Sequence, residues 1–167
     1  MSDTTTTTTS DGTTTIEAPV DVPTIVLRRE FAATPAQLLR AHTEPELFVR
    51  WTGPDGYEVT VDQWDPRTGG SYRYLVGTGD EQNAFRGCFH TVREDRIVQT
   101  FTWEGVPDGV ALDTITFEEV EPGRTRVVTL SVVESFEVRD MILSSGMEVG
   151  VNDGYARLDA MLAAGEL

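Results

Sequence analysis

The sequence predicts an α+β fold: a curved antiparallel sheet of about seven strands wraps around a long C-terminal helix, and two short helices follow the first strand. Three patterns support this prediction. Apolar residues recur with a helical period over residues 146–167, side chains alternate with a period of two over residues 57–133, and two helix-start signals lie at residues 34–37 and 43–46.

The C-terminal segment, residues 146–167, predicts the longest helix. Its apolar stripe consists of Met147, Val151, Tyr155, Leu158 and Leu162, at steps of four, four, three and four residues. With a rise of about 1.5 Å per residue, such a helix is long enough to cross a whole sheet. Glycine also recurs every four residues from Gly146 to Gly154. Because glycine destabilises a helix by roughly 1 kcal/mol relative to alanine, this spacing indicates close approach to a neighbouring element.

The predicted sheet begins with a strand at residues 24–32, which are rich in branched and aromatic side chains. The later strands cover about residues 57–62, 72–76, 85–91, 97–104, 112–120 and 124–133. Short turns join them, which is typical of an antiparallel meander. Ser135 is expected to cap a further short helix whose Val138, Met141 and Ile142 face inward.

Residues 1–22 are expected to form a disordered, threonine-rich acidic tail, and residues 23–167 a single domain. The tail contains a run of threonine, several acidic residues and few apolar groups that could offset the entropy lost on ordering. The rest of the chain is long enough for a sizeable hydrophobic core.

The charge of the chain limits its partners. The chain carries 13 basic residues, all of them arginine, and 28 acidic residues, for a net charge of -15. Such a surface repels phosphate backbones and anionic lipid, so neither nucleic acid nor a membrane is expected as a partner. The N-terminal residues show no basic region followed by an apolar one, and no apolar run approaches the ~18 residues of a membrane span. A cytoplasmic location is therefore expected.

Residue types that commonly carry catalysis are scarce. The histidines are His42 and His90, and Cys88 is the single cysteine. Strand parity turns Cys88 and His90 away from the interior, and His42 is expected to interact with a helix C-terminus. No Cys/His cluster, calcium-loop spacing or phosphate-binding loop occurs, so neither a metal nor a cofactor is expected.

Several short motifs resemble one known family. They are Arg50-Trp51-Thr52-Gly53-Pro54, Asp65-Pro66-Arg67-Thr68-Gly69-Gly70, Phe85-Arg86-Gly87, Thr100-Phe101-Thr102-Trp103-Glu104, Thr125-Arg126-Val127, and Gly146-Met147 with Gly150. In order and spacing these motifs resemble the START-like, helix-grip superfamily (SRPBCC), and within it the group named after the activator of heat-shock protein 90 ATPase. The resemblance covers about residues 24–164. It implies a helix-grip fold with an interior cavity, while its members include ligand carriers, cyclases and chaperone regulators.

This chain departs from the family pattern at two positions. Many members carry tryptophan after the glycine that matches Gly150, where this chain has Val151. Many also carry a second aromatic residue after the tryptophan that matches Trp51, where this chain has Thr52. Both side chains are smaller, which favours a larger cavity.

A helix laid across a curved sheet leaves space that inward side chains enclose, and such cavities bind small, mostly apolar ligands. The candidate ligand-binding residues are Trp51, Tyr72, Tyr74, Phe85, Phe101, Trp103, Met147, Val151 and Tyr155. The aromatic residues among them either line this cavity or fill a core. Arg73 and Arg86 would suit a ligand carboxylate, but strand parity points them outward.

The predicted function is binding of a small hydrophobic or amphipathic molecule, and the sequence identifies no defensible catalytic group. One alternative is a cyclase or aromatase that acts on a polyketide-like substrate, for which the hydroxyls of Tyr72 and Tyr74 are the candidate acid–base groups. Another alternative is a module that regulates a chaperone. A chaperone or a second copy of the chain thus stays open as a protein partner.

Overall fold

The computed structural model describes residues 4–8 and 14–167 of the chain. Its strands are β1 (Thr4–Thr8), β2 (Thr14–Pro19), β3 (Thr24–Phe31), β4 (Glu58–Trp64), β5 (Ser71–Thr78), β6 (Glu81–Arg93), β7 (Arg96–Trp103), β8 (Ala111–Glu121) and β9 (Arg124–Val132). Its helices are α1 (Pro35–Thr43), α2 (Pro45–Trp51), α3 (Phe136–Ser144) and α4 (Met147–Ala163).

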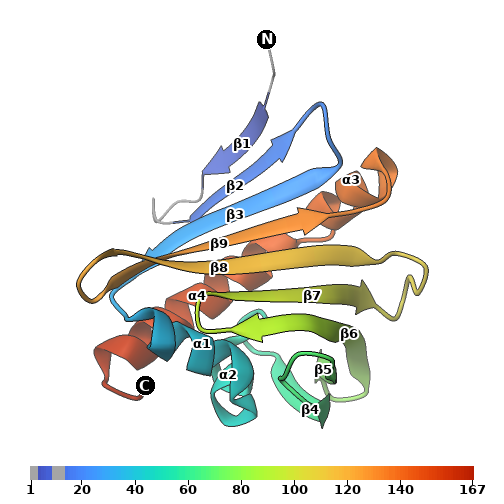
Figure 1. Cartoon of the computed structure of the whole chain (residues 1–167). Helices are drawn as coiled ribbons and strands as arrows, with labels where there is room; N and C mark the ends of the chain where they lie inside the picture. Colours follow the sequence, from blue (N-terminus) through green and yellow to red (C-terminus); the bar gives the residue numbers. More distant parts are fainter. Residues whose placement is uncertain (1–3, 9–13) are drawn as a thin grey trace.

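The strands of the described residues form one antiparallel sheet of nine strands in the order β1-β2-β3-β9-β8-β7-β6-β5-β4. The sheet is curved, and α4 crosses one of its faces from the end near α3 to the end near α1 and α2 (Figure 1). The α+β class, the curved sheet, the paired short helices and the long C-terminal helix are confirmed. The predicted seven strands correspond to β3–β9, and the count is too low because β1 and β2 extend the sheet.

The prediction of a disordered tail is wrong for part of residues 1–22. β2 pairs with β3, and β1 pairs with β2. Ile16 on β2 is 4% exposed and packs in one cluster with Ile25 and Leu27 of β3. Its β-branched side chain covers apolar residues that would otherwise face water, which explains the pairing. Residues 1–3 and 9–13 lie outside the described residues. The predicted domain boundary at residue 22 would separate β2 from its partner strand β3. Independent folding of residues 23–167 therefore stays a prediction that a truncated chain must test.

The short helices begin where the sequence signals predict. Thr34 accepts a hydrogen bond from the backbone N–H of Gln37, and the Gln37 side chain accepts one from the backbone N–H of Thr34, which is a capping box. α2 begins one residue later than its signal, because Glu44 is the N-cap and Pro45 occupies the first helical position. Ser135 caps α3 through the backbone N–H of Val138.

α4 lies against α2 at very short range. A Cβ atom on Gly154 would lie 2.6 Å from the carbonyl oxygen of Trp51, so only glycine fits there. The guanidinium of Arg157 donates hydrogen bonds to the carbonyl oxygens of Trp51, Thr52 and Gly53, which accept at the C-terminal end of α2. The predicted close approach is confirmed at Gly154. It fixes the helix against the turn that carries Trp51.

The core between α4 and the sheet is built from the predicted stripe with one addition. Tyr155 and Leu158 are buried, and Met161, which lies outside the predicted stripe, is also buried. Val151 and Met147, one and two turns before Tyr155, are only half-buried. The C-terminal half of α4 therefore packs tightly on the sheet, and its N-terminal half borders open space.

Candidate functional site

A cavity of about 630 Å³ lies between the N-terminal half of α4 and the concave face of the sheet. Strands β5–β9 and the α2–β4 connection supply most of its wall, and α3 and α4 supply much of the remainder. Single residues of α1, β3 and β4, residues of α2 and the β7–β8 loop complete it. All nine predicted site residues border it: Trp51, Tyr72, Tyr74, Phe85, Phe101, Trp103, Met147, Val151 and Tyr155. Residues that were dispersed over about a hundred positions in the sequence thus meet in one space.

One wall of the cavity is a row of stacked aromatic rings. The ring centroids of Tyr72 and Tyr74 lie 6.1 Å apart, those of Tyr74 and Phe85 5.4 Å, and those of Phe85 and Phe101 5.4 Å, each pair at a low interplanar angle. Tyr74 and Phe85 are direct partners across β5 and β6. Cross-strand stacking therefore forms a continuous apolar surface over three neighbouring strands.

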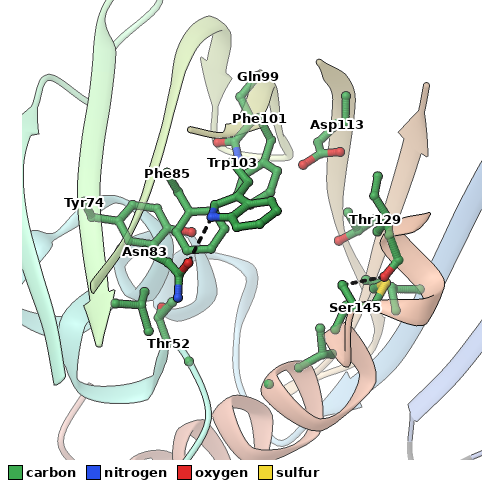
Figure 2. A pocket seen from close by; sticks show the side chains of 18 of the residues that line it. Thr52, Tyr74, Asn83, Phe85, Gln99, Phe101, Trp103, Asp113, Thr129 and Ser145 are labelled. Atoms are coloured by element: carbon green, nitrogen blue, oxygen red, sulfur yellow. Dashed lines mark hydrogen bonds between the residues drawn. The ribbon is translucent and has the colours of Figure 1, made fainter. Parts of the chain in front are cut away.

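The end of this row is open to solvent. Trp103 is 41% exposed, and its indole N–H donates to the side-chain oxygen of Asn83 at 3.1 Å (Figure 2). Trp103 has the inward parity that the sequence predicts and borders the cavity, yet it is exposed. It therefore forms part of the rim of the cavity rather than the core.

The floor of the cavity is buried and neutral. Trp51 stacks on Tyr155 with centroids 5.9 Å apart, and its indole N–H donates to the carbonyl oxygen of Ala41. His42 contacts the Trp51 ring, and its Nδ1 donates to the carbonyl oxygen of Leu38 at 2.7 Å. Burial lowers the pKa of His42 to about 4, so the ring is uncharged at neutral pH. His42 thus lies in the last turn of α1 and interacts with a carbonyl there, as expected, but as a neutral ring.

The tyrosine hydroxyls are poor candidates for proton transfer. Burial raises the pKa of Tyr72 and of Tyr74 well above the ordinary value, so both phenols stay protonated at physiological pH. The hydroxyl of Tyr72 already donates to the carbonyl oxygen of Thr100 at 2.6 Å. The acid–base roles considered for these residues find no support in their surroundings.

Asp113 is a site residue that the sequence reasoning missed. It lies on β8 and is 9% exposed, and it borders the cavity. The Ser131 hydroxyl donates to its Oδ1 at 2.5 Å, yet burial raises the pKa of Asp113 to about 6. The sequence held a signal: Asp113 alternates with Ala111, Ile115 and Phe117, all of which point to the interior. A carboxylate at an inward position of an apolar strand is the pattern to search for.

The remaining polar candidates lie away from the cavity. Arg73 pairs with Glu104 and Asp62, and Arg86 is exposed, as their parity predicts. Cys88 and His90 are exposed on the other face of β6. Over residues 4–8 and 14–167, no group of three or more histidine, cysteine or acidic side chains could hold a metal ion. No helix in the same residues is long and apolar enough to span a bilayer.

Known proteins share this architecture. The family model described as "Activator of Hsp90 ATPase homolog 1-like protein" matches residues 32–163. A crystal structure of a Rhodobacter sphaeroides protein is 29% identical, with 84% of this chain and 93% of its own covered and a TM-score of 0.77. Two others at 24% identity share the fold. The match to a Mycobacterium smegmatis protein covers 88% of this chain and 94% of that protein, with a TM-score of 0.79. The match to an Arthrobacter aurescens protein covers 89% of this chain and 91% of that protein, with a TM-score of 0.80. A comparison with curated proteins gave no match.

Proposed function

The chain belongs to the family of activator of Hsp90 ATPase homolog 1-like proteins, within the helix-grip superfamily, and from this premise we propose that it binds a small, mostly apolar or amphipathic molecule in the cavity under α4. The observation that carries the proposal is the cavity itself. Its volume of about 630 Å³ falls in the range of about 300–1,000 Å³ typical of small-molecule sites.

The composition of the wall supports a ligand with an apolar body. Stacked rings on β5–β7 border the same space as Met147 and Val151 of α4. A few polar groups, among them Gln99 and Thr129, interrupt this surface and could orient a ligand. The strong acidity of the chain also supports a proposal without a nucleic-acid partner.

The first test is substitution of Val151, which borders the cavity between Met147 and Tyr155. Val151→Trp is expected to fill the empty volume with an indole. The free energy of unfolding should then stay within about 1 kcal/mol of the parent, whereas overpacking a filled core would lower it by roughly 1–3 kcal/mol. Binding of N-phenylnaphthylamine, a neutral fluorescent probe, should weaken by about tenfold or more, a change of about 1.4 kcal/mol.

Val149→Trp is the matched control. Val149 lies on the same helix but is 59% exposed and does not border the cavity, so this variant should bind the probe as the parent does. Unchanged probe binding in a stable Val151→Trp protein would place the ligand elsewhere. Native mass spectrometry of the purified chain, with and without the substitution, would show whether a molecule is bound during expression.

The two alternative functions have their own tests. A cyclase-type activity would depend on a titratable group inside the cavity, and turnover of a polyketide-like substrate that Asp113→Asn abolishes would support it. The description of the family names a chaperone activator. Retention of purified chaperone by the immobilised chain, with stimulation of its ATPase, would support that function instead.

A further inference from the structure

The ionisable groups on the cavity wall are unbalanced. Asp113 is the carboxylate among the described lining residues, and no arginine lines the cavity. His42 is neutral at neutral pH because burial lowers its pKa to about 4. The wall therefore presents negative charge without a cation to offset it.

Asp113 itself lacks a cationic partner within residues 4–8 and 14–167. Its one side-chain hydrogen bond comes from the neutral hydroxyl of Ser131, and no ion pair to it is formed. The titratable groups whose pKa responds to its charge are Tyr72 and Tyr74 on β5 and Tyr155 on α4, and all three are neutral. A carboxylate buried among neutral groups loses hydration, and one hydroxyl hydrogen bond replaces only part of it.

Aromatic faces lie next to this carboxylate. Gln99 of β7 is the direct partner of Asp113 across the strands, so Phe101, two residues further along β7, is its diagonal neighbour on the same face. Figure 2 shows the Asp113 carboxylate turned toward the space that Phe101 and Trp103 border from the other side. A cation placed there would contact a carboxylate and the faces of aromatic rings, and both interactions favour positive charge.

We propose that the cavity selects amphipathic cations, that is, a protonated amine on an apolar body, with the ammonium group hydrogen-bonded to Asp113 and the body against the aromatic wall. This inference rests on the ligand-binding function proposed above and adds the sign of the ligand's charge. The net charge of -15 also attracts cations to the chain and repels anions. An apolar carboxylic acid of the same size is disfavoured because its charge would lie beside that of Asp113.

Three probes that share one naphthylethyl body test the proposal. They carry an ammonium, a hydroxyl or a carboxylate, and calorimetry at neutral pH gives the affinity of the parent chain for each. The ammonium probe should bind about tenfold tighter than the alcohol, and the carboxylate probe weakest. In Asp113→Asn the ammonium probe should lose this advantage, while the affinity for the alcohol stays within about twofold of the parent.

Asp108→Asn is the matched control. Asp108 is exposed, does not border the cavity and forms no ion pair in the described residues, and its substitution changes the net charge by the same amount. The ammonium preference should survive this change, because it depends on Asp113 and not on the overall field. Loss of the preference in both variants would overturn the role of Asp113.

A titration of the parent chain gives a second measurement that needs no variant. Burial raises the pKa of Asp113 to about 6, so the affinity for the ammonium probe should fall as the pH drops below that value, while the affinity for the alcohol stays constant. If the alcohol binds but the ammonium probe is no tighter at any pH, the inference fails and the ligand-binding proposal stands. If none of the three probes binds, the ligand-binding proposal fails and the inference fails with it.

Discussion

Asp113 lies on the wall of the cavity, and its burial there lowers the free energy of unfolding at neutral pH. In the unfolded chain its pKa lies at the ordinary value near 4, and burial raises it to about 6 in the folded chain. The folded state therefore holds this proton more tightly. Below about pH 4 both states are protonated and the group has no effect, whereas the free energy of unfolding falls as the pH rises through this window and stays reduced above about pH 6.

Asp113→Asn is accordingly expected to stabilise the chain at neutral pH. The shift of about two pKa units corresponds to a gain on the order of 2–3 kcal/mol at pH 7, because the neutral amide does not need to be ionised in the interior. The gain should shrink between about pH 6 and pH 4 and vanish below it. Urea unfolding of parent and variant over this range measures it. A difference that does not change with pH would show that Asp113 is not buried as a charge.

The alternation of side chains along a strand predicts which face a residue lies on. It does not predict how far neighbouring elements cover that residue. Parity placed Phe101 and Trp103 on the inward face of β7 correctly, and both border the cavity. It could not show that Trp103 is 41% exposed. Asp113 has the same inward parity, but a search for aromatic and apolar inward residues passes over a carboxylate at such a position.

At the scale of elements, the junction of α2 and α4 fixes where the cavity floor lies. Gly154 allows the backbone of α4 to approach the carbonyl oxygen of Trp51, and Arg157 ties the same turn to the helix. Trp51 in turn stacks on Tyr155. The position of the floor therefore depends on a backbone contact as well as on the side chains that line it.

Gly154→Ala and Gly150→Ala separate this contact from helix propensity. Both substitutions should gain up to about 1 kcal/mol of propensity in the same helix. A Cβ at position 154 would lie 2.6 Å from the Trp51 carbonyl oxygen, whereas one at position 150 would make an ordinary contact of 3.6 Å with Pro54. Gly154→Ala should therefore destabilise by about 1–3 kcal/mol, and Gly150→Ala should be neutral or stabilising. Thermal unfolding of the two variants measures this, and equal midpoints would contradict the close approach.

The helices and the seven strands β3–β9 were predictable because their signals are local. Capping residues, turn residues and the periods of two and 3.6 all act over a few neighbouring positions. β2 was missed for the converse reason. Its threonines resemble a disordered, low-complexity tail, and what orders it is a distant strand whose Ile25 and Leu27 require cover. Such pairing depends on the whole sheet and cannot be read from the segment itself.

For the molecule as a whole, removal of residues 1–20 tests whether β1 and β2 belong to the folding unit. The truncation removes Ile16 and so exposes Ile25 and Leu27 to water. It also removes the Thr14 hydroxyl, which accepts a hydrogen bond from the buried Arg29 side chain. The expected loss is about 2–4 kcal/mol, from the apolar side chains returned to water. Thermal unfolding of the full and truncated chains measures it, with Val20→Ala, an exposed position, as the control. An unchanged midpoint would show that the domain folds without these strands.

The placement of the tryptophans gives the whole molecule an optical property. Trp51, Trp64 and Trp103 are the three tryptophans of the chain, and every one of them borders the cavity. Ultraviolet emission of the unlabelled chain therefore originates at the cavity, from two indoles that donate to backbone carbonyls and one at the solvent-exposed rim. A molecule that enters displaces solvent from Trp103 and shifts its emission to the blue, so extraction of a ligand carried through purification would appear as the opposite shift.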